Sequence, residues 1–315
     1  MIKYIIMKQY AILFIFSLFS LAAFASDINL QIISSSAQII PEKPWEEYPT
    51  LGQALQENSD LQINSYGEGG AEYLTIQGYN KGVQIYLDGA PLPMDITGIT
   101  DISLIPTAII ERVEIVEGFN PASPQATGSV YIYTKKPIDN ATVFDASAYT
   151  ASNKTNLFSL GMRGSVFDKL PYQLSYSRNT SDGFQINSGY TKDAVNFKVE
   201  PFKNQTLSYI YLHSNIGLSG GTTTPIGQWD GEKEKTPVST TDYMEDTLNQ
   251  IAFNGQAGKF NYGAAYNNLD RQGENWGEVK IQNQDYFAFA EYALFDFLSL
   301  GSSYKHSQIH TNSSY

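Results

Sequence analysis

Histidine, serine and acidic residues are the first to consider for catalysis or metal binding, because the chain has no cysteine. Of the three histidines, His213, His306 and His310, the last two are four residues apart, which puts both on one face of a β-strand. Zinc sites need three or four ligands, and no third ligand is close in sequence. A serine hydrolase would need His, Ser and an orienting polar residue on one face, and no such set stands out. We therefore expect no enzyme, no catalytic or metal-binding residue and no cofactor.

Carboxylates gather in the segment 215–246, and these acidic residues alternate with Lys233 and Lys235. Calcium takes several carboxylate oxygens, but this spacing matches no compact cation-binding loop. The simpler interpretation is a solvated loop. The acidic residues are Asp230, Glu232, Glu234, Asp242, Glu245 and Asp246.

The composition indicates the elements that must position these residues. Only 17% of the 315 residues are charged, while 42% are apolar and 22 are tyrosines. Low charge with abundant Tyr, Gly and Ser is typical of exposed β-strands rather than helical bundles. A net charge of −12 argues against nucleic acid as a partner, because such binding depends on neutralising phosphates. The missing cysteines exclude disulfides, Cys-ligated metals and thiol nucleophiles.

Residues 1–25 predict a secretory signal peptide. Lys3 and Lys8 precede an apolar run over 10–24, and Ala23-Phe24-Ala25 is a small-x-small cleavage pattern. A retained N-terminal anchor is the alternative, but the run is short for a membrane span. No later segment reaches 18 apolar residues, so the mature chain either stays soluble outside the cytoplasm or enters a membrane as a closed β-barrel.

A small α+β domain is expected over about 27–137. Thr50-Leu-Gly-Gln53 has capping-box spacing, in which a hydroxyl and an amide satisfy the first N–H groups of a helix through about Gln56. Pro106 can begin another helical turn. Apolar and β-branched runs predict strands at 61–64, 73–77, 83–87, 112–116 and 128–134.

The order of these segments resembles the plug domain of TonB-dependent outer-membrane receptors, over about 90 residues. Several motifs in register carry the resemblance: Thr50-Leu-Gly-Gln-Ala-Leu55, Leu74-Thr-Ile-Gln-Gly78, Val83-Gln-Ile-Tyr-Leu-Asp-Gly-Ala-Pro-Leu92, Ser103-Leu-Ile-Pro106 and Ile110-Glu-Arg-Val-Glu-Ile-Val-Glu-Gly118. The motif residues carried over are Gln77, Gly78, Asp88, Gly89, Pro91, Glu111, Arg112, Glu117, Gly118 and Gly128.

Three positions depart from the family pattern. The family usually has arginine at Gln77 and at Glu117, and those arginines are thought to lock plug to barrel through charged contacts. Glu117 reverses the charge and cannot keep the same partner. An equally weighted interpretation is that Glu117 is a solvated turn residue without a role in latching. Only Gly128 remains of the usual glycines before the last plug strand. The resemblance therefore predicts a plug whose conventional latching is altered.

The family also carries an extended segment near the mature N-terminus, which pairs as a β-strand with the inner-membrane TonB protein. Residues 26–45 would be this periplasmic segment, and the nearest match to the TonB-contacting stretch is Asn29, Leu30, Gln31, Ile32 and Ile33. Its β-branched residues suit strand addition, although such pentapeptides also occur by chance.

Residues 141–315 have the rhythm of transmembrane β-strands. Runs of about ten residues alternate apolar with polar, as at Tyr172, Leu174 and Tyr176 against Gln173 and Ser175. Short connections at 168–171, 201–204, 258–259 and 296 alternate with longer stretches at 180–189, 215–246 and 271–282, as in outer-membrane barrels. Tyr at strand ends, such as Tyr149 and Tyr209, suits aromatic girdles. A soluble β-sandwich is the alternative.

The predicted fold is therefore a signal peptide (1–25), a plug domain (46–137) and antiparallel transmembrane barrel strands (141–315). About nine strands are expected where the family has 22, which suggests a truncated member. The resemblance implies an outer-membrane receptor, in contact with lipid, for TonB-energised uptake of a scarce solute such as an iron–siderophore complex or cobalamin. A non-transporting binding or adhesion protein, or an inactive fragment, is the alternative. Candidate substrate contacts are Tyr66, Tyr73, Met94, Trp229 and Trp276.

Overall fold

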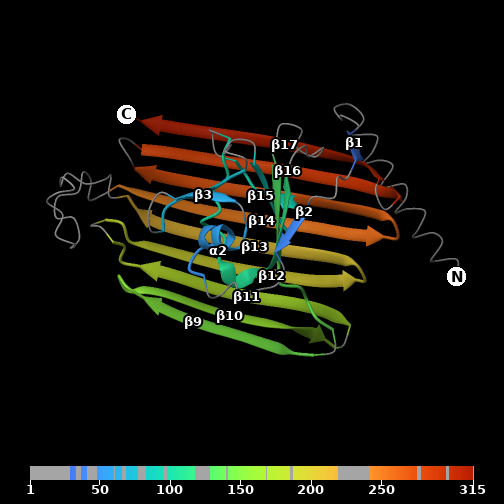
Figure 1. Cartoon of the computed structure of the whole chain (residues 1–315), viewed down its shortest axis with the longest axis horizontal. Coiled ribbons are helices and arrows are strands. Elements are labelled where there is room, and N and C mark those ends of the chain that lie inside the picture. Colours follow the sequence, from blue (N-terminus) through green and yellow to red (C-terminus); the bar gives the residue numbers. More distant parts are fainter. Residues whose placement is uncertain are drawn as a thin grey trace.

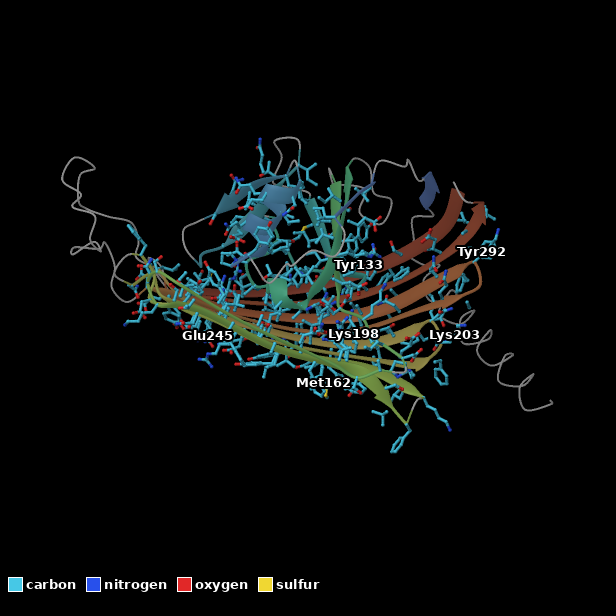
Figure 2. The ribbon with its side chains drawn as sticks, turned by 60° about the horizontal axis from the view of Figure 1, so that its bottom comes forward. Tyr133, Met162, Lys198, Lys203, Glu245 and Tyr292 are labelled. Atoms are coloured by element: carbon cyan, nitrogen blue, oxygen red, sulfur yellow. The ribbon has the colours of Figure 1, made fainter. Side chains whose placement is uncertain are left out.

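The protein has two parts, an inner domain and a large curved sheet whose concave face holds it (Figures 1 and 2). The computed structural model describes residues 29–32, 37–40, 48–59, 61–65, 69–76, 83–94, 98–117, 128–139, 141–167, 169–184, 187–218, 242–274, 278–295 and 298–314. The predicted signal peptide lies outside these residues. No helix among them is long and apolar enough to cross a membrane.

The inner domain, residues 37–139, begins its helix where the sequence predicted. The Thr50 side chain caps α2 (Leu51–Asn58) by accepting a hydrogen bond from the backbone N–H of Gln53 at 3.2 Å. The second half of the predicted capping box is wrong, because the Gln53 amide donates to Glu57 instead. The strands and the 3₁₀ turn are β2 (Ala37–Ile40), β3 (Gln62–Ser65), β4 (Glu72–Thr75), β5 (Val83–Leu87), β6 (Ala90–Pro91), η2 (Thr107–Ile109), β7 (Ile110–Glu117) and β8 (Gly128–Thr134).

A five-stranded sheet forms the centre of the inner domain, with the order β2-β7-β8-β5-β6. The β5–β8 pair is parallel, and the other pairs are antiparallel. Leu51 and Leu55 of α2 belong to the same buried cluster as Ile85 of β5 and Ile132 of β8. Burial of these side chains away from water is the main force that holds the domain together.

The curved sheet contains nine consecutive antiparallel strands, each paired with the next in sequence. Strand β1 (Asn29–Ile32) pairs with β17 as a tenth strand. The nine strands are β9 (Val143–Ala151), β10 (Thr155–Val166), β11 (Leu170–Ser181), β12 (Tyr190–Phe202), β13 (Gln205–Gly217), β14 (Tyr243–Ala257), β15 (Phe260–Glu274), β16 (Glu278–Phe295) and β17 (Leu298–Ser314).

The two faces of the curved sheet differ as the alternating pattern predicted. Residues that point away from the inner domain form an exposed apolar band, whereas most of their neighbours in sequence are polar and face inward, with a few apolar exceptions. Tyr209 belongs to the outer band, but Tyr149 pairs with buried Leu157 and lies on the inner face, so it is not a girdle residue. The band includes Phe158, Leu160, Leu174, Phe197, Leu207, Ile251, Tyr286, Tyr292 and Tyr304.

All but one of the predicted connections agree with the bounds of the strands. At one end of the sheet, only 167–169, 203–204, 258–259 and 296–297 separate successive strands. At the other end, 182–189 and 218–242 are longer, but the predicted long stretch at 271–282 is wrong. Strands β15 and β16 continue through it and leave only 275–277 between them. The sequence did not predict this extension, because the outer-face residues there are polar and the alternation of apolar with polar residues is lost. A strand needs apolar residues on its outer face only where that face meets lipid.

Candidate functional site

The junction between the inner domain and the concave face of the curved sheet gathers many of the buried polar side chains. Of the predicted motif residues, Asp88 and Gly89 form the β5–β6 turn at this junction, and Pro91 is the last residue of β6. Glu117 ends β7, and its side chain is outside the described part of the chain. Gln77, Gly78, Gly118, Ile33, Tyr66, Trp229 and Trp276 also lie outside the described residues.

Asp88 joins the inner domain to strand β12 through a buried ion pair. Its carboxylate lies 2.8 Å from the ammonium of Lys198, and both side chains are less than one-tenth exposed. The turn needs an unusual backbone, with φ of 49° at Asp88 and 81° at Gly89. Aspartate and glycine tolerate this left-handed region better than other residues. The Asp-Gly pair therefore serves both the turn and the contact with the curved sheet.

Thr134, the last residue of β8, completes this network. The Asp88 carboxylate accepts hydrogen bonds from the Thr134 backbone N–H at 2.9 Å and from its hydroxyl at 2.7 Å. Lys198 donates to the Thr134 carbonyl at 2.9 Å, and Asn196 donates to the Thr134 hydroxyl at 2.9 Å. Each buried charge thus has several partners, which is what makes burial of an ion pair tolerable. Figure 2 shows Lys198 on the concave face, close to Tyr133 of β8.

Side-chain amides on three successive strands hold the segment that follows β5. Gln250 and Asn254 of β14 donate to the carbonyls of Leu87 and Asp88, both at 2.8 Å. Asn267 of β15 donates to the Pro91 carbonyl at 2.7 Å, and Asn283 of β16 donates to the Met94 carbonyl at 3.2 Å. We call these four side chains the amide ladder. They bind backbone atoms, so they fix the position of residues 87–94 whatever their side chains.

A second charged cluster joins Asp101 of the inner domain to β14 and β15. The Arg271 guanidinium donates two hydrogen bonds to Asp246 on the neighbouring strand, at 2.6 and 2.7 Å. The same guanidinium lies 3.9 Å from the carboxylate of Asp101. Two parallel N–H···O bonds orient a guanidinium firmly. Asp246 therefore holds Arg271 in a fixed direction, and Arg271 presents its remaining charge to the inner domain.

Lys192 of β12 approaches the same cluster and donates to the Ser103 carbonyl at 2.9 Å. Burial raises the pKa of Asp101 above its ordinary value, and the nearby charge of Lys192 lowers it. Burial likewise raises the pKa of Glu72, against the hydrogen bond from Thr50 and the charge of Lys192. Glu72 accepts a hydrogen bond from the Gly52 N–H in the first turn of α2, at 3.1 Å. The cluster thus connects the helix to the curved sheet.

The polarity of these contacts is the reverse of the pattern that the family resemblance implies. In this chain the inner domain supplies the carboxylates Asp88 and Asp101, and the curved sheet supplies the cations Lys198 and Arg271. The expectation of altered latching rested on Gln77 and Glu117, whose side chains are not described. The described contacts provide a latch of opposite sign at other positions.

An apolar contact adds to the polar junction. Leu92, Leu104 and Ile105 of the inner domain belong to the same buried cluster as side chains on the concave face of the curved sheet. Those side chains are Ala194, Ile210, Leu212, Leu248 and Leu269. Apolar residues at a few inner-face positions therefore anchor the domain, and the polar contacts surround them.

The other described motif residues contact neighbours within the inner domain. Arg112 of β7 lies over the Tyr133 ring at 3.7 Å and pairs with Glu114 at 3.4 Å. Glu111 pairs with Lys136 at 3.5 Å. At Gly128 a Cβ atom would come within 2.7 Å of Ile76 Cδ1, so close packing of β8 requires glycine there.

Two predicted substrate contacts, Tyr73 and Met94, are described. Tyr73 lies in β4 and forms an isolated bridge with Asp101, while the Met94 carbonyl accepts from Asn283 in the amide ladder. Both lie beside the junction. Whether they touch a solute stays a prediction.

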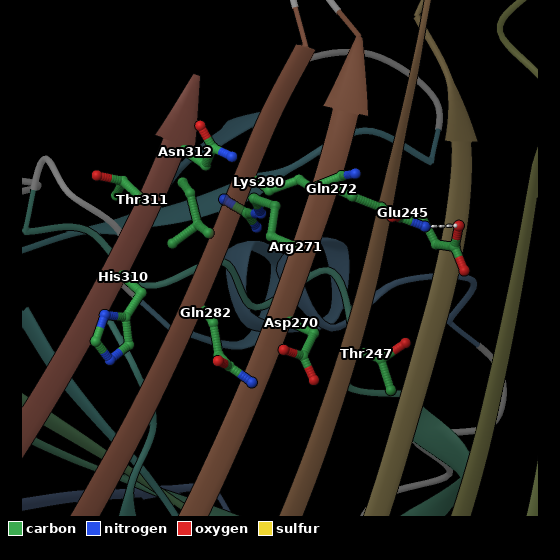
Figure 3. Close-up of a pocket in the computed structure, with 11 residues that line it drawn as sticks. Glu245, Thr247, Asp270, Arg271, Gln272, Lys280, Gln282, His310, Thr311 and Asn312 are labelled. Atoms are coloured by element: carbon green, nitrogen blue, oxygen red, sulfur yellow. Dashed lines mark hydrogen bonds between the residues drawn. The ribbon is translucent and has the colours of Figure 1, made fainter. Parts of the chain in front are cut away.

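A shallow hollow of about 420 Å³ lies on the outer face of β14–β17 (Figure 3). Gln272 donates to Glu245 there at 2.7 Å, and His310 lines its edge. His306 and His310 do share one face, as their spacing predicted. No group of three metal-binding side chains occurs among the described residues.

Sequence reasoning missed most residues of the junction. The alternating pattern places Lys198 on the polar side of a strand, no pattern singles out Lys192, and Arg271 and Asp246 fall in predicted loops. One signal was available: Asn196, Lys198 and Glu200 alternate with apolar residues along β12, which places a cation on the face that turns away from lipid. Their partners were not readable, because no local pattern specifies which of two distant segments meet.

Comparison with known proteins identifies the inner domain. Residues 30–130 match the family model of the TonB-dependent receptor plug domain. No curated protein sequence matches the chain. Among solved structures, the ferric yersiniabactin uptake receptor FyuA from Yersinia pestis aligns with a TM-score of 0.68 at 15% identity, over 88% of this chain and 49% of FyuA.

Two further solved structures give similar values. The ferric citrate transporter FecA, in its unliganded form, aligns with a TM-score of 0.65 at 16% identity, over 90% of this chain and 48% of FecA. The pyoverdine outer membrane receptor FpvA from Pseudomonas aeruginosa PAO1, bound to pyoverdine, aligns with a TM-score of 0.65 at 11% identity, over 88% of this chain and 47% of FpvA. The chain thus spans about half the length of these receptors.

The inner domain therefore carries the plug domain of TonB-dependent receptors within residues 30–130. The curved sheet has the fold of about half of the barrel in the solved receptors.

Proposed function

We propose that the chain acts in TonB-energised uptake of a scarce solute across the outer membrane, with iron–siderophore complexes or cobalamin as the substrate class. The observation that carries the proposal is the polar junction. A plug that must move needs contacts that fix one position but exchange readily for water, and hydrogen bonds do so better than a continuous apolar interface. The amide ladder and the two charged clusters meet this requirement.

The proposed coupling segment is Asn29–Ile33, which would pair with a TonB-type energy-transducing protein. Its first four residues form β1 and pair antiparallel with Leu298–Gly301 of β17. This pairing supports the proposal, because a segment that adds to one strand edge has the backbone conformation for adding to another. Binding would occur outside, at external loops and at plug residues such as Tyr73 and Met94.

Uptake of radiolabelled solutes tests the proposal. Cells that express the chain would be offered ferric yersiniabactin, ferric citrate, ferric pyoverdine, ferric enterobactin and cyanocobalamin, with and without a functional TonB protein. We expect uptake of at least one solute that requires TonB. Deleting residues 27–36 should abolish that uptake and spare binding at the cell surface.

A point variant avoids any effect of the deletion on export. Ile32→Pro removes a backbone donor that an added strand needs, while Ile32→Val keeps a β-branched residue and serves as the matched control. We expect energised uptake to be lost in the first and retained in the second. Uptake that survives both the deletion and Ile32→Pro would contradict the coupling role. Surface binding without any uptake would favour the binding or adhesion protein.

A further inference from the structure

A cavity of about 770 Å³ lies between the inner domain and β12–β17 and is separate from the apolar anchor. Asn204 and Gln256 line it near the tight turns of the sheet, so it opens toward the end where the sequence predicts the periplasm. Its volume is in the range of sites that hold small molecules. The external loops, where the solute is expected to bind first, belong to the other end of the strands.

Aromatic rings form both walls of this cavity. On the inner domain, Tyr86 and Tyr131 stack with ring centroids 4.7 Å apart, and Tyr133 continues the row. On β16, Phe287 and Phe289 lie with centroids 5.9 Å apart, and Phe287 meets Tyr86 edge-on at 6.5 Å. Rings on two facing walls favour a flat ligand, because each face of the ligand can then stack.

The space exists because the neighbouring strand carries small residues. Phe289 pairs with Ser303 of β17, and Glu291 pairs with Gly301. Neither Ser303 nor Gly301 fills the volume beside the aromatic wall, and both line the cavity. The cavity therefore leaves room for a small molecule beside the aromatic wall.

Polar groups at the rim would orient a ring that carries hydroxyl or carboxyl groups. Arg112 and Lys136 line the cavity, each paired with a neighbouring glutamate and each with further N–H donors, and Glu200 and Glu291 provide acceptors. Burial and the neighbouring charge of Glu114 raise the pKa of Tyr133 to about 12, so its hydroxyl keeps its proton at physiological pH. The lining is therefore mixed: apolar faces for the ring and charged or hydroxyl groups for its substituents.

We propose that this cavity is an inner binding site for a planar aromatic ring with hydroxyl and carboxyl substituents, between Tyr131 and Tyr133 of the plug and Phe289 of the barrel strands. The site would receive a solute of that chemistry after it leaves the external site, and in this respect it rests on the proposed uptake function. Arg112 would pair with a carboxylate on the ring.

Equilibrium binding to the full-length chain in lipid nanodiscs tests the site without any energy source. The probe is 2,3-dihydroxybenzoate, and the reporter is the fluorescence of a tryptophan introduced by Phe289→Trp. We expect saturable quenching. The control is Tyr286→Trp, which lies on the same strand but on the outer face and should show none. Tyr133→Trp reports from the opposite wall if Phe289→Trp does not fold.

Two comparisons give the chemistry of the ligand. In the Phe289→Trp background, Tyr131→Leu should lower the affinity for the probe about 3- to 10-fold, since the substitution removes one stacking partner. Quinate, a saturated ring with hydroxyl and carboxyl groups, should not compete. Lack of saturable quenching in both folded reporters overturns the site, and equal competition by quinate overturns its aromatic specificity. Neither result depends on TonB or on residues 29–33, so the site and the uptake function can fail separately.

Discussion

The centre of the inner domain and its junction with the curved sheet are held by different forces. Leu51, Leu55 and Ile85 in the centre are at most 1% exposed and contact apolar neighbours. At the junction, ion pairs and amide–carbonyl hydrogen bonds surround a smaller apolar anchor. Apolar burial is non-directional and tolerates small shifts, whereas hydrogen bonds require one geometry. The inner domain can therefore keep its own fold while its position in the sheet depends on a few polar residues.

The largest effect is expected at the junction. Lys198→Met leaves the Asp88 carboxylate buried without its cation, which costs about 3–5 kcal/mol. Much of this cost disappears if the inner domain leaves the sheet, because Asp88 then returns to water. We therefore expect release of an intact inner domain, seen as rapid cleavage by a protease in the connection between β8 and β9, residues 135–142, while the sheet keeps heat-modifiable migration.

The double variant Asp88→Asn/Lys198→Met is the matched control, since it removes both charges. Protection from the protease should largely return. If Lys198→Met leaves the protection unchanged, the ion pair does not hold the domain, and the comparison between centre and junction loses its main support.

A core substitution should have a slightly smaller and different effect. Leu55→Ala leaves a cavity in the centre of the inner domain and should lower its free energy of unfolding by about 2–5 kcal/mol. The domain should then unfold in place, so protease sites inside 48–139 become accessible together. Urea titration with a protease readout distinguishes this pattern from release. Leu174→Ala on the outer face is the control, and it should leave the inner domain unaffected.

The smallest effect concerns pH. Burial raises the pKa of Glu72, so the folded state binds this proton more tightly than the unfolded state. The resulting stabilisation is complete below the ordinary value of 4.5 and is lost as pH rises through the raised pKa. Glu72→Gln keeps an acceptor for the Gly52 N–H but cannot ionise.

We therefore expect the urea midpoint of the unchanged chain, compared with that of Glu72→Gln, to fall as pH rises above about 4.5. Parallel midpoints from pH 4 to 8 would show that Glu72 has the same pKa in both states. Asp101 is present in both chains, so only the part of its titration that depends on the charge of Glu72 contributes to the difference.

Much of the fold follows from local patterns. Thr50 caps its helix because its hydroxyl is one position from the first turn, and Val83–Leu87 and Gly128–Thr134 are strands where β-branched and apolar runs predicted them. The resemblance to the plug domain followed from several motifs in one order, and the match over 30–130 confirms it. The prediction of a loop at 271–282 was wrong for a local reason as well, since polar residues at the end of a long strand resemble those of a loop.

Local patterns in the sequence predicted the resemblance to the plug domain, the two-part organisation and the outward face of most strands of the curved sheet, because capping, alternation and motif order are local or nearly local properties. Only the tertiary structure decided which side chains meet. Asp88 and Lys198 are 110 residues apart, and Gln250 reaches the carbonyl of Leu87 across 163. No pattern within one segment specifies such partners, since they are fixed by the register of the sheet and by how the inner domain packs within it.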